Sequence, residues 1–258
     1  MALIIACANQ KGGVGKTTTT ANLGATLSRM GKRVLAVDMD AQANLTAHFG
    51  LERELETSVA NALLDRNGEL PIYRIEDDAG TTIDVAPASL ELASVEFQLA
   101  AAIGRELRLR EHLERFRDRY DFILIDTPPS LGLLTVNALV AADCVIIPTE
   151  ARFFSLQGLY MLQETITEAA SLNPKIEILG VLLSKYDRRL REEKAVWQYL
   201  HERWGDRVFA TEIGTNSKIL EAASAGVPVN AYVGAKKARD AYQLLAREVL
   251  DRVEAARL

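Results

Sequence analysis

The chain has 258 residues, of which 48% are hydrophobic and 25% charged, so it can bury a full core and its composition excludes a disordered protein. Its formal net charge of −5 argues against a surface coated with nucleic-acid-binding charge, although a local basic patch is compatible with it. No run of about 18 apolar residues occurs, and the N-terminal MALIIACANQ has neither the basic region nor the cleavage site of a signal peptide. We therefore expect a cytoplasmic protein with no stable membrane association.

Short aliphatic or β-branched runs alternate with amphipathic helical segments along the whole chain. The runs are LIIACAN (3–9), RVLAVDMD (33–40), TIDVAP (82–87), DFILID (121–126), CVIIPTE (144–150) and IEILGVLLS (176–184). Runs that are apolar on both faces are typical of central parallel strands covered by helices. The pattern predicts a doubly wound α/β fold of the P-loop NTPase type, with a mostly parallel sheet and helices on both faces. Without a linker or repeat, one domain over 1–258 is expected.

Several local expectations follow from this arrangement. The first helix should run from the glycine loop to about Met30 and end at Gly31 in a left-handed cap conformation. The last helix should span about Lys237 to Ala256, and its apolar stripe should pack on the core; the stripe consists of Tyr242, Leu245, Val249, Leu250 and Val253. Cys7 and Cys144 lie in apolar runs, so both are expected to be small buried hydrophobes.

The stretch ANQKGGVGKTTTT (8–20) predicts a phosphate-binding loop between the first strand and the first helix. It departs from the usual pattern because Gln10 replaces a glycine and because Lys11 precedes the usual lysine. The nucleotide contacts of the loop are expected from Gly12, Gly13, Val14, Gly15, Lys16, Thr17 and Thr18. Lys16 would reach the β- and γ-phosphates, and the Thr17 hydroxyl would ligate Mg²⁺. The alternative is a glycine-rich turn that merely opens a helix.

Three carboxylates follow strands at the edge where ligands of such folds bind. Asp38 and Asp40 are two residues apart, so in extended geometry both project to the same side. Asp126 ends an apolar strand, where a charge is costly unless it is paired, solvated or bound to a metal. Asp38 and Asp40 could instead be plain loop acids or helix caps.

The motif KGGVGKTT resembles the deviant Walker A motif of the ParA/MinD ATPases. The likeness continues through VDMDAQAN (37–44), FILIDTPPSLG (122–132) and IPTEARFFSLQGL (147–159), and it covers nearly the whole chain. The resemblance implies ATP and Mg²⁺ as cofactors and a homodimer that sandwiches ATP. It also implies a slow ATPase that a ParB-like adaptor protein stimulates.

The same resemblance implies roles for individual residues. Lys11 would cross the dimer to the phosphates of the other subunit, where a second ammonium stabilises charge on the transferring phosphoryl group. Asp38 would organise the Mg²⁺ shell, Asp40 would orient the attacking water, and Asp126 would be the Walker B aspartate. Asn216 occupies the position where family members approach the adenine. The segment TPPSLG resembles the second switch loop.

Two basic sets are candidates for non-specific DNA binding, which ParA and Soj proteins achieve with basic residues at similar C-terminal positions. They are Lys185, Arg188, Arg189 and Arg191, and Lys218, Lys236, Lys237 and Arg239. The alternative is a solvated face, given the neighbouring acids. Many Soj-like chains have an arginine where this one has Gly214 or Thr215, which leaves Lys218 to act alone in that segment.

The sequence thus predicts a nucleoid-associated switch for chromosome or plasmid partitioning. Positioning of a protein cargo, such as a carboxysome or a chemoreceptor cluster, is the first alternative. A MinD-like membrane role is disfavoured because REVLDRVEAARL has several acids and no bulky aromatic residue. His48, His112 and His201 lack ligand spacing, and a metabolic ligase of this fold would lack the second lysine. Because the chain begins at its first strand, no N-terminal helix-turn-helix and no sequence-specific DNA binding are expected.

Overall fold

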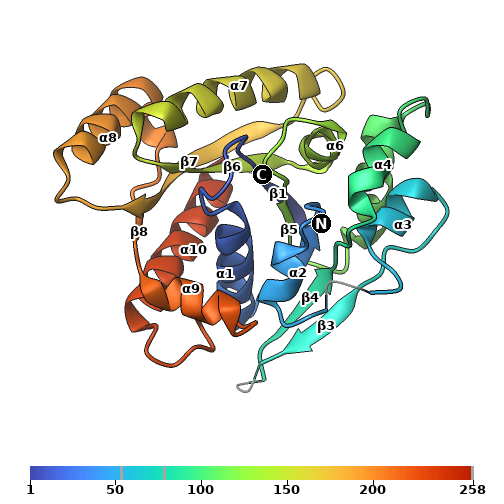
Figure 1. Cartoon of the computed structure of the whole chain (residues 1–258), viewed down its shortest axis with the longest axis horizontal. Helices are drawn as coiled ribbons and strands as arrows, with labels where there is room; N and C mark the ends of the chain where they lie inside the picture. The colour runs from blue at the N-terminus through green and yellow to red at the C-terminus, as the bar shows by residue number, and fades with distance from the viewer. Residues whose placement is uncertain (53–54, 78–79, 257–258) are drawn as a thin grey trace.

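Within the described residues of the computed structural model, 1–52, 55–77 and 80–256, eight strands form one sheet with helices on both faces (Figure 1). The strands are β1 (Leu3–Cys7), β2 (Val34–Asp38), β3 (Tyr73–Glu76), β4 (Thr82–Ala86), β5 (Phe122–Asp126), β6 (Cys144–Glu150), β7 (Glu177–Tyr186) and β8 (Ile213–Gly214). The helices are α1 (Lys16–Arg29), α2 (Asn44–His48), α3 (Val59–Leu64), α4 (Leu92–Gln98), α5 (Arg108–Leu113), α6 (Leu133–Ala141), α7 (Phe153–Ala169), α8 (Arg191–Trp204), α9 (Ser217–Ser224) and α10 (Lys236–Ala256). Short 3-10 turns are η1 (Arg105–Leu107), η2 (Glu114–Phe116) and η3 (Gly205–Arg207).

The strand order is β3-β4-β2-β5-β1-β6-β7-β8, and every neighbouring pair is parallel except β3 with β4. This arrangement confirms the predicted doubly wound, mostly parallel fold. β1 lies between β5 and β6, so the chain winds outward from it in both directions. Ligands of such sheets bind beyond the carboxyl ends of the strands at this switch point. The glycine loop follows β1 at that place.

The core has two faces because successive strand residues point to opposite sides of the sheet. In β1, Ile5 and Cys7 pack with α1 and α10, whereas Ile4 and Ala6 pack with α3 to α6 on the opposite face. Helices α7 and α8 extend that opposite face over β6 and β7. Figure 1 shows α1 and α10 side by side on one side of the sheet and α7 on the other. Cys7 and Cys144 are both buried, as expected.

Both helix predictions are confirmed within a residue or two. α1 ends at Arg29, and Gly31 follows with φ of +83°, in the left-handed region that favours glycine. The stripe on α10 faces the core, with Tyr242, Leu245 and Val249 buried and Leu250 and Val253 partly buried. Over the residues that the structure describes, none of the helices combines the length and apolar character that a membrane span requires.

Two edge strands were missed in the sequence. β3 alternates between half-buried and exposed positions, so its apolar content is too low to stand out, and it pairs antiparallel with β4. β8 has two residues and pairs with the end of β7 only. Edge strands of this kind depend on their neighbour for pairing, and short sequence runs do not reveal that neighbour.

Candidate nucleotide site

The glycine loop between β1 and α1 has the backbone geometry of a phosphate cradle. Gly13 and Gly15 have φ of +74° and +90°, which strain any residue with a Cβ. Val14 is buried between them, and its carbonyl accepts a hydrogen bond of 2.6 Å from the Ser184 hydroxyl at the end of β7. The loop is therefore held open against the sheet, with the N-terminus of α1 directed into the cleft.

Lys16 begins α1 and is buried, with 6% of its surface exposed. Its ammonium donates to the Lys11 carbonyl at 3.2 Å, so the side chain folds back over the glycine loop. Burial lowers the pKa of Lys16, while the carboxylates of Asp126 and Asp40 act in the opposite direction. A cation that is already desolvated at a helix N-terminus is suited to hold phosphate oxygens.

The first turn of α1 and the end of β5 bring Thr17 and Asp126 together, as a magnesium site requires. The Thr17 hydroxyl donates to Asp126 Oδ2 at 2.6 Å, and Asp126 Oδ1 is buried with no hydrogen-bond partner among the described residues. Burial, followed by the nearby Asp38 charge, raises the pKa of Asp126 well above its ordinary value. An unpartnered buried carboxylate oxygen beside a hydroxyl fits Mg²⁺ or one of its waters, because the cation would supply the missing positive charge.

Asp38 lies opposite Asp126 in the register of β2 and β5. Unlike Asp126, it has hydrogen-bond donors at both of its carboxylate oxygens. Oδ1 accepts from the Asp40 amide at 3.1 Å, and Oδ2 accepts from the amide and hydroxyl of Thr46 at 2.9 and 2.8 Å. Burial raises the pKa of Asp38 to about 6, although the Thr46 hydrogen bonds oppose that shift. Asp38 therefore fixes the loop that carries Asp40 and the start of α2.

Asp40 lines the cleft beside the glycine loop. Its side chain is mostly buried, and Oδ1 accepts from the Gln42 amide at 3.0 Å. The cleft has a volume of about 560 Å³ and is lined by Gly12, Gly13, Gly15, Lys16, Thr17, Thr18 and Asp40, with residues of α2, α9 and the loop after β5. This volume lies within the range of small-molecule sites. The structure thus brings most of the predicted loop residues around one cavity.

Lys11 occupies a different place from Lys16. Its ammonium donates to Glu150 Oε2 at 2.9 Å and to the Ser155 hydroxyl at 3.2 Å, and 36% of the side chain is exposed. Glu150 also receives the ammonium of Lys185 at 3.3 Å. Burial alone would raise the pKa of Glu150, but hydrogen bonds from the two lysines outweigh it and hold that pKa below its ordinary value.

Glu150 and Ser155 were not predicted as site residues. Glu150 ends the apolar run of β6 in the same way that Asp126 ends β5, and that position is the signal that could have found it. Asn216 is placed differently from the other nucleotide candidates: within the described residues it does not line the cleft. Its Oδ1 accepts from the Lys218 amide at 3.0 Å and caps α9.

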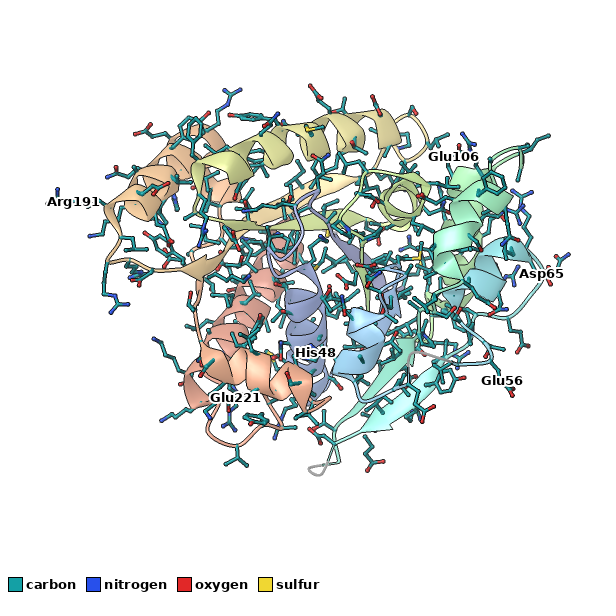
Figure 2. All side chains as sticks on the ribbon, viewed as in Figure 1. His48, Glu56, Asp65, Glu106, Arg191 and Glu221 are labelled. Atoms are coloured by element: carbon teal, nitrogen blue, oxygen red, sulfur yellow. The ribbon has the colours of Figure 1, made fainter. Side chains whose placement is uncertain are left out.

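The eight predicted DNA-binding residues fall into three groups. Lys185 lies at the glycine loop, where its ammonium donates to the Gly13 carbonyl at 2.6 Å. Arg188, Arg189 and Lys218 form ion pairs with Glu212, Asp187 and Glu221. In the described part of the chain, the remaining residues form no ion pair; they are Arg191, Lys236, Lys237 and Arg239. Figure 2 shows Arg191 projecting outward from the first turn of α8.

The two basic segments lie on one flank of the molecule, formed by α8, β8 and α9 in Figure 1. Lys237 at the start of α10 is close enough to Asp187, before α8, to contribute to the low pKa of that carboxyl. That pKa is about 2, mainly because Arg189 donates to the carboxylate. The start of α10 therefore lies near the segment that precedes α8.

His48, at the end of α2, lines the cleft, and Figure 2 marks its position. Burial lowers its pKa from 6.5 to about 4. In the unfolded chain His48 takes up a proton as the pH falls below 6.5, whereas in the folded chain it does so only below about 4. The folded state therefore loses stability relative to the unfolded state as the pH falls from 6.5 to 4. We therefore compare the free energy of unfolding at pH 7.5 and at pH 5. Acidification should lower it by about 2 kcal/mol less in His48→Gln than in the unaltered chain.

Urea unfolding at both pH values measures this difference. His201→Gln is the matched control, because His201 is partly exposed and stacks on Trp197. It shows what the removal of a histidine away from the cleft does to the same measurement. A loss in His48→Gln equal to that of the unaltered chain would show that this residue remains able to protonate in the folded state.

Comparisons with known proteins agree with this geometry. A family model described as an AAA domain, AAA_31, matches residues 2–178. The chain is 42% identical over 251 residues to the sporulation initiation inhibitor protein Soj of Bacillus subtilis, covering 96% of this chain and 98% of Soj. It is 43% identical over 257 residues to the chromosome partitioning protein ParA of Caulobacter vibrioides, covering 96% and 94% of the two chains.

Solved structures show the same fold. The structure of a cobyrinic acid a,c-diamide synthase from Mycobacterium smegmatis with a bound ATP analogue and magnesium superposes with a TM-score of 0.84. It is 33% identical in sequence, and the match covers 99% of this chain and 97% of that one. A related protein of nearly equal length therefore holds a magnesium nucleotide on this fold.

Proposed function

Because the chain belongs to the ParA/Soj family of partition ATPases, we propose that it is an ATP-dependent dimerisation switch that acts in chromosome or plasmid partitioning. ATP binds with Mg²⁺ in the cleft at the glycine loop. The loop amides and Lys16 hold the phosphates, and Thr17 and Asp126 hold the cation. Mg²⁺, when bound, draws negative charge from the phosphate oxygens.

The observation that carries this proposal is the separation of the two lysine side chains. Lys16 is buried over the glycine loop of its own subunit, whereas the Lys11 ammonium lies 2.9 Å from Glu150 and remains partly exposed. At this position the Lys11 ammonium is better placed to contact the nucleotide of a second subunit than the nucleotide of its own. Two facing subunits would each offer Lys11 to the nucleotide of the other, so that ATP joins the dimer.

Asp40 and the switch loop after β5 supply the hydrolysis step. Asp40, held by the Asp38 loop and by the Gln42 amide, orients a water toward the terminal phosphate. Hydrolysis removes the group that bridges the two subunits and so ends the dimer. Intrinsic turnover is slow, and a ParB-like adaptor protein accelerates it.

The ATP dimer binds DNA without sequence preference and gathers on the nucleoid until hydrolysis releases it. The four basic residues that form no ion pair in the described chain favour this reading, and dimerisation doubles their number. They make phosphate contacts, so binding weakens as salt rises.

The test is DNA binding by the Lys236→Glu, Lys237→Glu double variant. With ATP it should bind duplex DNA roughly tenfold or more weakly, and the slope of log K against log salt should flatten by roughly two per subunit. Gel shifts or fluorescence anisotropy at several salt concentrations measure both quantities. Lys175→Glu, Arg247→Glu makes the same charge change at two other exposed positions and should alter affinity little.

Two other outcomes would redirect the proposal. DNA binding that does not depend on ATP, or that is absent, would favour the positioning of a protein cargo or a MinD-like membrane role. The M. smegmatis relative is named for an amide-forming reaction, so ATP hydrolysis that requires cobyrinic acid would favour a synthase. Hydrolysis stimulated by DNA and an adaptor supports the partition switch. The relative named for chromosome partitioning, ParA of C. vibrioides, is the more similar in sequence, at 43% against 33%.

A further inference from the structure

A second cleft lies at the end of the sheet opposite the glycine loop. It has a volume of about 430 Å³ and is formed by the end of α1, the start of β2, the β3–β4 hairpin and the residues before β5. Figure 1 shows the C-terminal end of α1 directed toward that hairpin. Val34 begins β2 here and Asp38 ends it at the nucleotide site, so roughly 15 Å of strand separates the two clefts.

The lining of this cleft is strongly cationic although the whole chain has a net charge of −5. Its charged residues are Arg29, Lys32, Arg33, Arg74 and Arg119, against the single acid Asp84. Its few apolar side chains include Val34, which is buried, and Tyr120, whose hydroxyl donates to Asp84 at 2.8 Å. A ligand here would be held by charge and hydrogen bonds, because little apolar surface is available for burial.

Two guanidinium groups are fixed in place at the walls of the cleft. Arg74 donates to both oxygens of Asp84 at 2.9 and 3.1 Å, and Arg33 donates to Asp121 at 2.8 Å. Burial alone would raise the pKa of Asp84, but hydrogen bonds from Arg74 and Tyr120 outweigh it and keep that carboxyl ionised. The Arg74 and Arg33 side chains remain 70% and 58% exposed, so their outer edges can still bind an anion.

Two further cations act on nearby acids only through their charge, Lys32 on Asp121 and Arg119 on Asp84. Among the described residues, Lys32 forms no ion pair, and Arg119 lies over the Phe116 ring at 5.1 Å without one. Both are exposed at the cleft. Arg29 is paired only loosely, with its Nη1 3.8 Å from Asp77. Unbalanced like charges around a concavity repel one another until an anion occupies it.

We propose that this cleft binds a small molecule that carries two or more phosphate groups. Arginine forks match phosphate oxygens, the volume fits a ligand of about nucleotide size, and the five cationic side chains at the cleft offer more N–H donors than the oxygens of one phosphate can use. Lys32 and Arg119 close on the ligand, while Arg33 and Arg74 form its fixed walls. The site is separate from the ATP site and adds a second ligand to the protein.

Calorimetric titration of inorganic triphosphate into the Lys16→Ala chain tests this proposal, because that variant removes the main phosphate contact of the glycine loop. We expect saturable binding that becomes about tenfold or more weaker when Lys32→Glu and Arg119→Glu are added. Lys175→Glu and Arg247→Glu, added instead, should change the affinity less than about threefold. In the chain with Lys16 intact, the Lys32→Glu, Arg119→Glu double variant should hydrolyse ATP within about twofold of the parental rate. A failure of the second binding site can therefore be told apart from a failure of the ATP switch.

Two results would overturn the proposal. The first is that triphosphate fails to bind the Lys16→Ala chain; if the two charge reversals then weaken duplex DNA binding, this face contacts nucleic acid instead. The second is that triphosphate binds equally well with and without the two reversals.

Discussion

Lys11→Ala should retain Mg-ATP binding and lose the ATP-dependent dimer, whereas Lys16→Ala should lose nucleotide binding altogether. Lys16 is buried at the start of α1 and holds the phosphates of its own subunit, so its removal leaves the phosphate charge without its main partner. Lys11 lies outside that cradle against Glu150. Its removal should weaken dimerisation by roughly 100-fold or more, because the phosphate charge buried between subunits would lose its partner.

Light scattering with ATP, ADP or no nucleotide measures the dimer, and titration with a fluorescent ATP analogue measures binding. Lys175→Ala is the control, since it removes an exposed lysine away from the site. A Lys11→Ala chain that still dimerises with ATP would defeat the assignment of Lys11 to the partner's phosphates. Loss of nucleotide binding in the same variant would instead place Lys11 among the contacts of its own subunit.

Much of the fold follows from the sequence because the central strands are buried on both faces. Such strands are continuous apolar runs, and the acids that end them mark the ligand edge. Asp126 and the glycine loop were predictable in this way, and so was the end of α1 at Gly31. Each depends on residues that are neighbours in the chain.

The contacts that were missed join residues far apart in the chain. Lys185 was predicted on a DNA surface, yet it is in the left-handed region with φ of 54° and its ammonium reaches Gly13. No pattern of spacing announces that backbone conformation in a lysine. Glu150, which binds Lys11 from 139 positions away, depends equally on the order of β1 and β6 in the sheet. Side-chain pairing of this kind requires the strand order first.

Asp38 and Asp126 illustrate the same limit within one site. The family resemblance implies a place in the Mg²⁺ shell for both. Asp38 has both oxygens engaged by Asp40 and Thr46, whereas Asp126 has one oxygen free of any described partner. Loop stabilisation therefore competes with metal binding at Asp38, and only the path of the chain after β2 reveals the competition.

Asp40→Ala should bind ATP, dimerise and then remain on DNA, because hydrolysis that would release it no longer occurs at a useful rate. A positioned carboxylate that orients or deprotonates water contributes roughly 100- to 10,000-fold to such a reaction. We expect ATP turnover with DNA and adaptor present to fall by about that amount. The nucleotide affinity should stay nearly unchanged, since the glycine loop and Lys16 hold the phosphates.

Asp40→Asn separates chemistry from loop structure. The amide oxygen can still accept the hydrogen bond that the Gln42 amide gives to Asp40 Oδ1, so the loop should keep its conformation while the charge is lost. Both variants should therefore be trapped as ATP dimers on DNA, measured by the lifetime of the complex after free ATP is removed. Asp65→Ala, at an exposed turn away from the cleft, is the control and should release DNA at the parental rate. If Asp40→Asn hydrolyses ATP as fast as the unaltered chain while Asp40→Ala does not, Asp40 acts by shaping the loop after β2, and the water must be oriented by another group.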